Sequence, residues 1–440
     1  MSHVFPRHTK AQLPTAVAGD GCYLIDANGK RYFDGSGGAA VSCLGHSDAA
    51  VIQAVQDQVG KLAFAHTSFL TSDPAEELAD LLIANAPGDL DRVYFVSGGS
   101  EATESAIKLA RQYYLEKGET KRRHVIARRQ SYHGNTLGAL AAGGNEWRRA
   151  QFAPLLIDIS HIAPCYEYAE RPEGETPYDY GQRVANELEA EILRLGPESV
   201  MAFMAEPVVG ATSGAVPPVE GYFKRVREIC DQYGVLLILD EVMCGMGRTG
   251  HLFACDVDDV APDILCIAKG LGAGYQPIGA MLCSKQIYQA IEAGSGFFQH
   301  GHTYIGHPVA TAAALAVVRS MLDRGLVQRS AEMGEKLQAA LVERFGQHPN
   351  VGDIRGRGLF RGIELVADRN TKTPFDPSTG LAKKIKKAAF EAGLICYPMS
   401  GTRDGVNGDH ILLAPPFIIT DEQITEVVDK LEVAISASLP

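Results

Sequence analysis

An acidic side chain and an amine stand at the ends of two short apolar segments. Asp240 directly follows the apolar residues 236–239, and Lys269 follows a second apolar run at 264–268. Runs of this length are typical of buried strands rather than membrane spans. Because ligands of open α/β sheets bind outside the carboxyl ends of the strands, we expect both side chains to reach one crevice. An amine desolvated there loses its proton near neutral pH and can form an imine with a carbonyl compound.

Taken alone, this pair also has an ordinary explanation, since many α/β proteins carry acids and lysines at strand ends for structural reasons. The surrounding text is more specific, with LILDEVMCGMGRTG followed by IAKGLGAGYQPIGA. These segments closely resemble the class III aminotransferases, which use pyridoxal phosphate. The resemblance implies that Asp240 holds the protonated pyridine nitrogen. It also implies that Lys269 carries the cofactor as a Schiff base.

A glycine-rich turn leads from a predicted strand into a predicted helix. The strand at 93–96 is followed by SGGS and then by EATESAIKLAR, which has helical spacing. Glycines let the backbone approach an anion, and the free amides at a helix start attract it. An ordinary helix cap explains SGGS alone better, and the P-loop spacing is missing. With the helix included, the segment resembles the family's phosphate site, which assigns Gly99 and Ser100 to the cofactor phosphate.

Three more segments match the same family. By themselves, the Tyr132-His133 pair and the acid that ends SVMAFMAE fit packing or capping roles. The resemblance puts Tyr132 on the face of the pyridine ring, a contact worth about 1 kcal/mol beyond its buried area. It also counts His133 and Val242 among the cofactor contacts. The text EPVVG resembles the family site whose acid, here Glu206, approaches the substrate side of the cofactor.

Thr303 lies in the loop GHTYIGHP, ahead of an Ala-rich helix. From the sequence alone its hydroxyl is simply a loop residue. In the family this threonine reaches across a dimer interface to the phosphate of the neighbouring subunit. The resemblance therefore implies a homodimer with shared active sites, or a tetramer built from such dimers.

Two arginines compete for a substrate carboxylate. The segment DIRGRGLFRGIELV holds three arginines, too many for a buried strand unless one meets an anion. In many relatives the arginine of IRG clamps the substrate carboxylate, which favours Arg355. Arg403 in SGTRDGVNGDH is the alternative, because loop arginines act so in some amine-using relatives, although this loop is longer. Ala39 and Ala40 stand where those relatives often have aromatic residues, so Ala40 predicts an open pocket wall.

Composition excludes several other classes of protein. The 440 residues suggest two or three domains, and the net charge of -12 argues against a nucleic-acid partner. No run of eighteen apolar residues or signal-peptide pattern occurs, so we expect no membrane partner and a cytoplasmic location. Nine scattered cysteines without a CxxC pair predict neither disulfides nor a metal site. GMGRTG matches a dinucleotide fingerprint, but no helical pattern follows it, so we interpret it as a turn.

The resemblance covers residues 20 to 430 and implies an α/β fold, fold type I of the pyridoxal-phosphate enzymes. A large cofactor-binding domain at 61–330 is expected to hold a mostly parallel seven-stranded sheet flanked by helices. A smaller α/β domain is expected to combine residues 1–60 with residues 331–440. Its first part includes a hairpin around Asn28-Gly29, since this dipeptide separates two apolar-alternating segments.

The expected reaction is ping-pong transfer of an amino group from a primary amine or ω-amino acid to a keto acid, pyruvate or 2-oxoglutarate. A racemase, an aminomutase or a dialkylglycine-type decarboxylase would share every cofactor residue. A non-catalytic binding module is the more remote alternative, because such a relative would be expected to lose Lys269 or Asp240. The sequence leaves open the donor, the acceptor, the stereopreference and the choice between dimer and tetramer.

Overall fold

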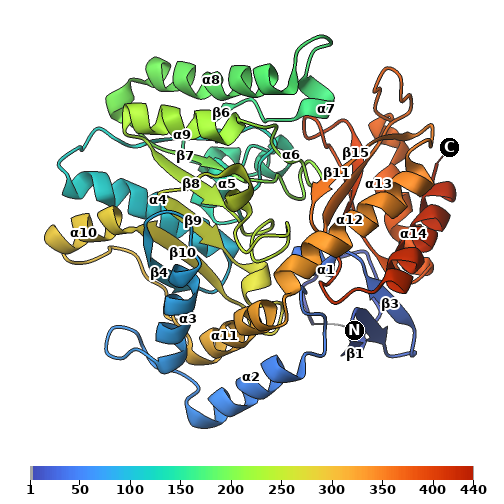
Figure 1. Ribbon diagram of the computed structural model, residues 1–440, viewed down its shortest axis with the longest axis horizontal. Helices are drawn as coiled ribbons and strands as arrows, with labels where there is room; N and C mark the ends of the chain where they lie inside the picture. Colours follow the sequence, from blue (N-terminus) through green and yellow to red (C-terminus); the bar gives the residue numbers. More distant parts are fainter. Residues whose placement is uncertain (1–2, 440) are drawn as a thin grey trace.

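A seven-stranded sheet forms the centre of the large part of the chain in the computed structural model, which describes residues 3–439 (Figure 1). Its strand order is β4-β10-β9-β8-β7-β5-β6, and neighbours run parallel except at β10, which is antiparallel to both β4 and β9. The mostly parallel sheet expected from the sequence is confirmed. Its strands are β4 Leu90–Val96, β5 His124–Arg128, β6 Ser160–Ile162, β7 Val200–Ala205, β8 Leu236–Asp240, β9 Ile264–Ile267 and β10 Gly279–Ser284.

Both faces of this sheet are covered, which explains why its strands are apolar throughout. In β8, Leu236 and Ile238 join the core beneath one group of helices, whereas Leu237 and Leu239 join the core on the opposite face. Each fully buried leucine or isoleucine contributes about 1.5–3 kcal/mol. The first group comprises α4 Gly99–Glu116, α5 Leu137–Ala142 and α10 Lys285–Ala293; the opposite face carries α3 Asp73–Ala84, α8 Pro177–Leu195, α9 Tyr222–Tyr233 and α11 Pro308–Asp323.

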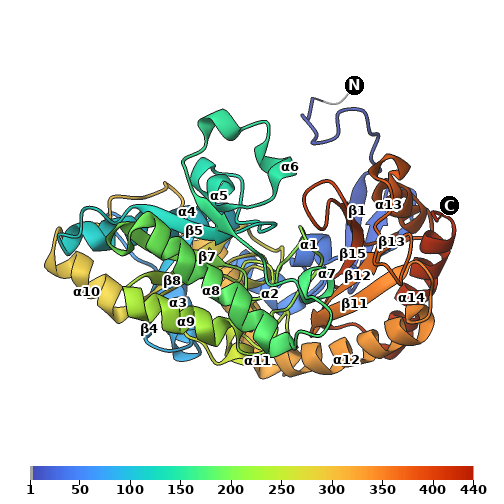
Figure 2. The same cartoon turned by 90° about the horizontal axis from the view of Figure 1, so that it is seen from above.

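A second core lies in the C-terminal part, on the right of Figure 1. Four antiparallel strands in the order β11-β12-β15-β14 pack against three helices. The long helix α12 runs from the large sheet's helices to this unit (Figure 2). The elements are α12 Leu326–Phe345, β11 Val351–Arg357, β12 Phe360–Leu365, α13 Leu381–Glu391, β14 Tyr397–Ser400, β15 Asp409–Leu413 and α14 Asp421–Ser436.

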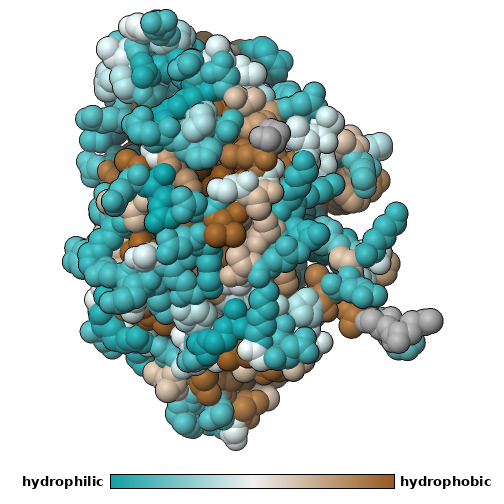
Figure 3. All heavy atoms as spheres, turned by 90° about the vertical axis from the view of Figure 1, so that its right-hand side faces the viewer, coloured by the Kyte–Doolittle hydropathy of each residue, from teal (hydrophilic) through white to brown (hydrophobic). Residues whose placement is uncertain are grey.

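The predicted hairpin around Asn28-Gly29 is present. Strands β2 Tyr23–Asp26 and β3 Arg31–Asp34 are antiparallel, and Gly29 has φ 81° in the turn between them. The C-terminal strand β13 Leu394–Ile395 pairs with β3 in parallel, while β1 Ala16–Asp20 flanks β2. Segments from the two ends of the chain therefore share one sheet. Ahead of β1, an N-terminal arm leaves the body of the molecule (Figures 2 and 3).

Helix α2 Ala49–Lys61 packs on α11, so the N-terminal segment also contacts the helices around the large sheet. The boundary between domains at residue 60 stays a prediction. Within residues 3–439 no helix is long and apolar enough to cross a bilayer. All nine cysteines are buried as free thiols. Three short helices complete the fold: α1 Gly37–Ala40, α6 Glu146–Arg149 and α7 Glu167–Glu170.

Candidate active site

Asp240 and Lys269 line one cavity of about 450 Å³ at the carboxyl ends of the parallel strands. The sequence-based expectation that the two side chains share a crevice agrees with this geometry. Six other predicted residues line the same cavity, namely Gly99, Ser100, Tyr132, His133, Glu206 and Val242.

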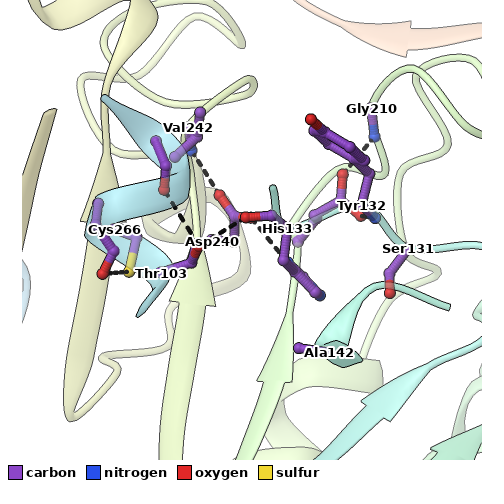
Figure 4. Close-up of polar contacts among 12 residues, drawn as sticks. Thr103, Ser131, Tyr132, His133, Ala142, Gly210, Asp240, Val242 and Cys266 are labelled. Carbon is purple, nitrogen blue, oxygen red and sulfur yellow. Dashed lines mark hydrogen bonds and ion pairs between the residues drawn. The ribbon is translucent and has the colours of Figure 1, made fainter. Parts of the chain in front are cut away.

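The carboxylate of Asp240 is buried and held from two sides (Figure 4). One oxygen lies 2.8 Å from Nδ1 of His133, and the other accepts a 3.0 Å hydrogen bond from the amide of Val242. Because a carboxylate only accepts, Nδ1 must carry the hydrogen. Thr103 donates to the carbonyl of His133 at 2.6 Å and so fixes the imidazole's backbone. The acid is thereby oriented in advance at the cavity wall.

Lys269 combines an unusual backbone with an unpaired amine. Its φ of 45° lies in the left-handed region, which costs a residue with a side chain about 1–2 kcal/mol. Burial lowers the pKa of its amine, while the negative charges of Asp240 and Glu206 raise that pKa in part. Within residues 3–439 its Nζ forms no hydrogen bond or ion pair. Burial thus disfavours the charged form of an unpaired amine, which suits a nucleophile at this position.

The start of α4 has the features of an anion site. Gly98 caps the helix without any side-chain hydrogen bond, and residues 97–100 line the cavity. A Cβ on Gly99 would lie 2.6 Å from Cγ1 of Val242, so no side chain fits there. The amides at the helix start and the positive end of the dipole suit a phosphate. These residues therefore fit the phosphorylated cofactor that the sequence implied.

Glu206 supports the backbone that carries Tyr132. Its carboxylate accepts hydrogen bonds from the amides of Tyr132 at 3.1 Å and of Gly210 at 2.8 Å. Burial raises the pKa of this carboxyl group above its usual value. In this structure Glu206 therefore positions the aromatic residue and also faces the cavity itself.

Both predicted substrate arginines are bound to a single buried acid outside the cavity. Arg355 lies 2.7 Å from one oxygen of Glu364, and Arg403 lies 3.1 Å from the other. Arg355 also donates to the carbonyls of Ser213 and Gly214 at 2.6 Å and 2.9 Å. The guanidinium of Arg355 thus ties β11 to the loop after β7. A substrate-binding role for either arginine stays a prediction.

Ala40 and Thr303 also lie apart from the cavity. Ala40 is buried with φ 63° and packs with Val208 and Met243, which do line the cavity. It lies behind the residues that form the cavity wall. Any effect of its small side chain on the width of the pocket would therefore be indirect. Thr303 borders a separate space of about 960 Å³ along the loop before α11.

Sequence reasoning overlooked part of the cavity wall. Gln276, Pro277 and Ile278 line it, and so does Gly274. These residues lie within the segment that follows Lys269, and this nearness in sequence is the one feature from which their place in the cavity wall could have been predicted. Nothing in their residue types indicated that this loop turns back over the lysine.

Comparisons with known proteins agree with this geometry. A family model described as class III aminotransferase matches residues 5–435. An uncharacterized aminotransferase of Schizosaccharomyces pombe is 48% identical over 431 residues, which cover 97% of this chain and 93% of that protein. A thermostable (S)-enantioselective omega-transaminase from Thermomicrobium roseum superposes with a TM-score of 0.93 at 36% identity, covering 100% of this chain and 97% of that one.

A further solved structure, an omega transaminase from Pseudomonas jessenii in complex with PMP, has a TM-score of 0.92 at 32% identity and covers 99% of this chain and 96% of that one. Fold and site together define a pyridoxal-phosphate enzyme of fold type I. The chain belongs to the class III aminotransferases. It is an aminotransferase that uses pyridoxal phosphate and takes an amine and a keto acid as substrates.

Proposed function

We propose that this enzyme moves an amino group from a primary amine or ω-amino acid to a short keto acid, pyruvate or 2-oxoglutarate, in a ping-pong cycle. The observation that carries the proposal is the unpaired amine of Lys269, which shares its cavity with the Asp240 carboxylate and the anion site of α4. The omega-transaminase names of the structural neighbours support an amine donor.

Pyridoxal phosphate, when bound, supplies an electron-withdrawing ring that stabilises negative charge next to the reacting nitrogen. With the cofactor bound, Lys269 would hold it through Nζ, and the freed amine would take a proton from the substrate carbon and return one as general base and acid. Asp240 would keep the ring nitrogen of the bound cofactor protonated, because its negative charge favours the protonated form. His133 keeps that carboxylate aligned.

The remaining residues bind and orient the cofactor. Gly99 and Ser100 would offer backbone amides to the phosphate, and Val242 packs against Gly99 at the edge of the same site. Tyr132 would stack on the ring face, with its amide anchored by Glu206. This division of roles follows the chemistry of each side chain at its place in the cavity.

A panel of amine donors tested against pyruvate and 2-oxoglutarate checks the proposed reaction. We expect an added amine to bleach the yellow colour of the purified protein, and a keto acid to restore it, because each half-reaction runs separately in a ping-pong cycle. Release of carbon dioxide would indicate a decarboxylase instead. Inversion of an amino acid without any keto acid would indicate a racemase.

We also propose a homodimer in which Thr303 of one subunit completes the phosphate site of the other. Apolar side chains are exposed next to the loop that carries Thr303, including Phe69 at 85% and Tyr304 at 62% exposure. A second cavity of about 480 Å³ links Tyr304 and His307 to residues 276–278 of the central cavity. An exposed apolar surface of this kind beside a functional site is typical of a subunit interface.

Thr303→Ala tests this dimer. We expect the variant to bind pyridoxal phosphate about 10-fold more weakly, because one hydrogen bond to a charged phosphate is lost. A mixed dimer pairs a Thr303→Ala subunit with a Lys269→Ala subunit. One of its two sites then combines an intact Lys269 from the first subunit with an intact Thr303 from the second, and this site should bind the cofactor with normal affinity. Sedimentation as a monomer, or unchanged cofactor affinity in Thr303→Ala, would contradict the shared site.

A cytoplasmic location is likewise a proposal. Its support is that all nine cysteines remain free thiols, as is usual for proteins of reducing compartments. Expression of a tagged chain in its native cell, followed by fractionation, would check it.

A further inference from the structure

One arginine beside the cavity has no acidic partner. Arg148 lies in α6, and its guanidinium carbon is 4.7 Å from the ring centroid of Tyr132, which lines the cavity. Its neighbour Arg149 is paired with Glu146 at 3.1 Å. Within residues 3–439 the side chain of Arg148 forms no hydrogen bond or ion pair, although its Nε is shielded from solvent. The residue is half-buried, and a guanidinium without an anion has unused hydrogen-bonding capacity.

The other cations near the site are already neutralised or engaged. Arg355 and Arg403 share the buried carboxylate of Glu364, so neither offers a free positive charge to a ligand. Arg128 is buried and donates to the carbonyl of Glu206. Lys269 is assigned to the cofactor in the proposed function. Arg148 is thus a half-buried cation next to Tyr132 that has no counter-ion among the residues that the structure describes.

The charge of Arg148 reaches the reaction centre. It contributes, after burial, to the lowering of the pKa of Lys269, and it lowers the pKa of Tyr132 against the raising effect of burial. Arg7, exposed on the N-terminal arm, acts on Tyr132 in the same direction. Arg148 and Arg7 thus both place positive charge near Tyr132, which suits an incoming anion.

The backbone of Arg148 is held in place at the start of α6. The side chain of Asn145 caps α6 by accepting a 3.2 Å hydrogen bond from the amide of Arg148. Asn145 in turn donates to the side chain of the buried Gln130 at 3.0 Å. The guanidinium plane over Tyr132 is thus positioned by a fixed helix start and by cation–π attraction, which is worth about 0.5–2 kcal/mol.

We propose that Arg148 binds the carboxylate of the keto acid acceptor and thereby gives this enzyme its preference for 2-oxo acids over uncharged aldehydes and ketones. The proposal rests on the aminotransferase function proposed above. In a 2-oxo acid the carboxylate is bonded directly to the carbonyl carbon that receives the amino group. A cation beside the ring-stacking tyrosine is therefore suitably placed, and the planar guanidinium fork matches a carboxylate.

Kinetics of Arg148→Gln provide the first test. We expect the KM for pyruvate to rise about 10- to 100-fold, the size of a lost charge-assisted hydrogen bond pair, while the KM for propanal stays the same. Arg148→Lys should recover part of the loss, because it restores charge without the fork. Arg149→Gln is the matched control and should change neither value, since that arginine is already paired with Glu146.

Binding gives a second readout that does not depend on turnover. Trp147, the one tryptophan of the chain, precedes Arg148 and is 66% exposed, so its fluorescence can report a ligand there. We expect propanoate, an unreactive carboxylate, to change this fluorescence saturably in the holoenzyme and in Arg149→Gln. Arg148→Gln should bind propanoate at least about 10-fold more weakly.

The two tests separate the proposals. An unchanged pyruvate KM in Arg148→Gln would overturn the role of Arg148 while leaving the aminotransferase reaction intact. An equal loss with pyruvate and propanal would also overturn it, because Arg148 would then only position Tyr132. Tight, Arg148-dependent propanoate binding in an enzyme that transfers no amino group would support the anion site and refute the proposed reaction.

Discussion

Replacing Lys269 with alanine is expected to lower kcat by more than about 10⁴-fold, because the same amine holds the cofactor and moves the proton. Within residues 3–439 no other lysine lines the cavity. The variant should remain folded, since the side chain projects into the cavity rather than into a core, and alanine tolerates φ 45° about as well as lysine does. Its purified form should lose the yellow absorbance of the covalently held cofactor.

Steady-state kinetics, absorbance and circular dichroism of Lys269→Ala together check this expectation. Lys285→Ala is a suitable control, because that lysine is exposed at the start of α10. Retained turnover in a folded Lys269→Ala protein would rule out the assigned role. Loss of the dichroism signal would mean that unfolding had caused the inactivity, and Lys269→Arg would then serve as the replacement variant.

The large sheet and most of the cofactor site could be predicted from the sequence, because their signals are local. The apolar runs of β8 and β9 lead directly to Asp240 and Lys269, so the same short segment predicts both the strand and its functional residue. The turn before α4 likewise contains its own glycines. The close approach of Gly99 to Val242 explains why this turn requires glycine.

The substrate side could not be predicted in the same way, because it depends on which side chains meet across strands and loops. Arg355 seemed available in the sequence, yet it pairs with Glu364, which lies diagonally from it on the neighbouring strand β12 and also binds Arg403 from a loop. No sequence pattern singled out Arg148. Its proposed role follows from two tertiary features, the lack of an acidic partner within residues 3–439 and the stacking of its guanidinium on Tyr132. Which acid an arginine meets depends on strand register and loop path, which the residue pattern did not reveal here.

Asp240→Asn is expected to bind the cofactor and yet to slow proton abstraction by about 10³-fold. Asparagine has nearly the same shape, so the hydrogen bond from the Val242 amide can persist. It carries no negative charge, however, and no longer favours a proton on the ring nitrogen, so the electrostatic stabilisation of the carbanion-like transition state is lost.

The measurement for Asp240→Asn is the rate of a single half-reaction after rapid mixing with an amine, with cofactor content determined separately. Asp80→Asn, at an exposed position of α3, should behave as the wild type. The half-reaction rate of His133→Gln should lie between those of Asp240→Asn and the wild type, because this change removes only the imidazole that aligns the Asp240 carboxylate at 2.8 Å. A half-reaction of unchanged rate in a fully loaded Asp240→Asn enzyme would mean that the buried acid orders the cavity without acting on the ring, and the electrostatic part of the mechanism would have to be assigned to another residue.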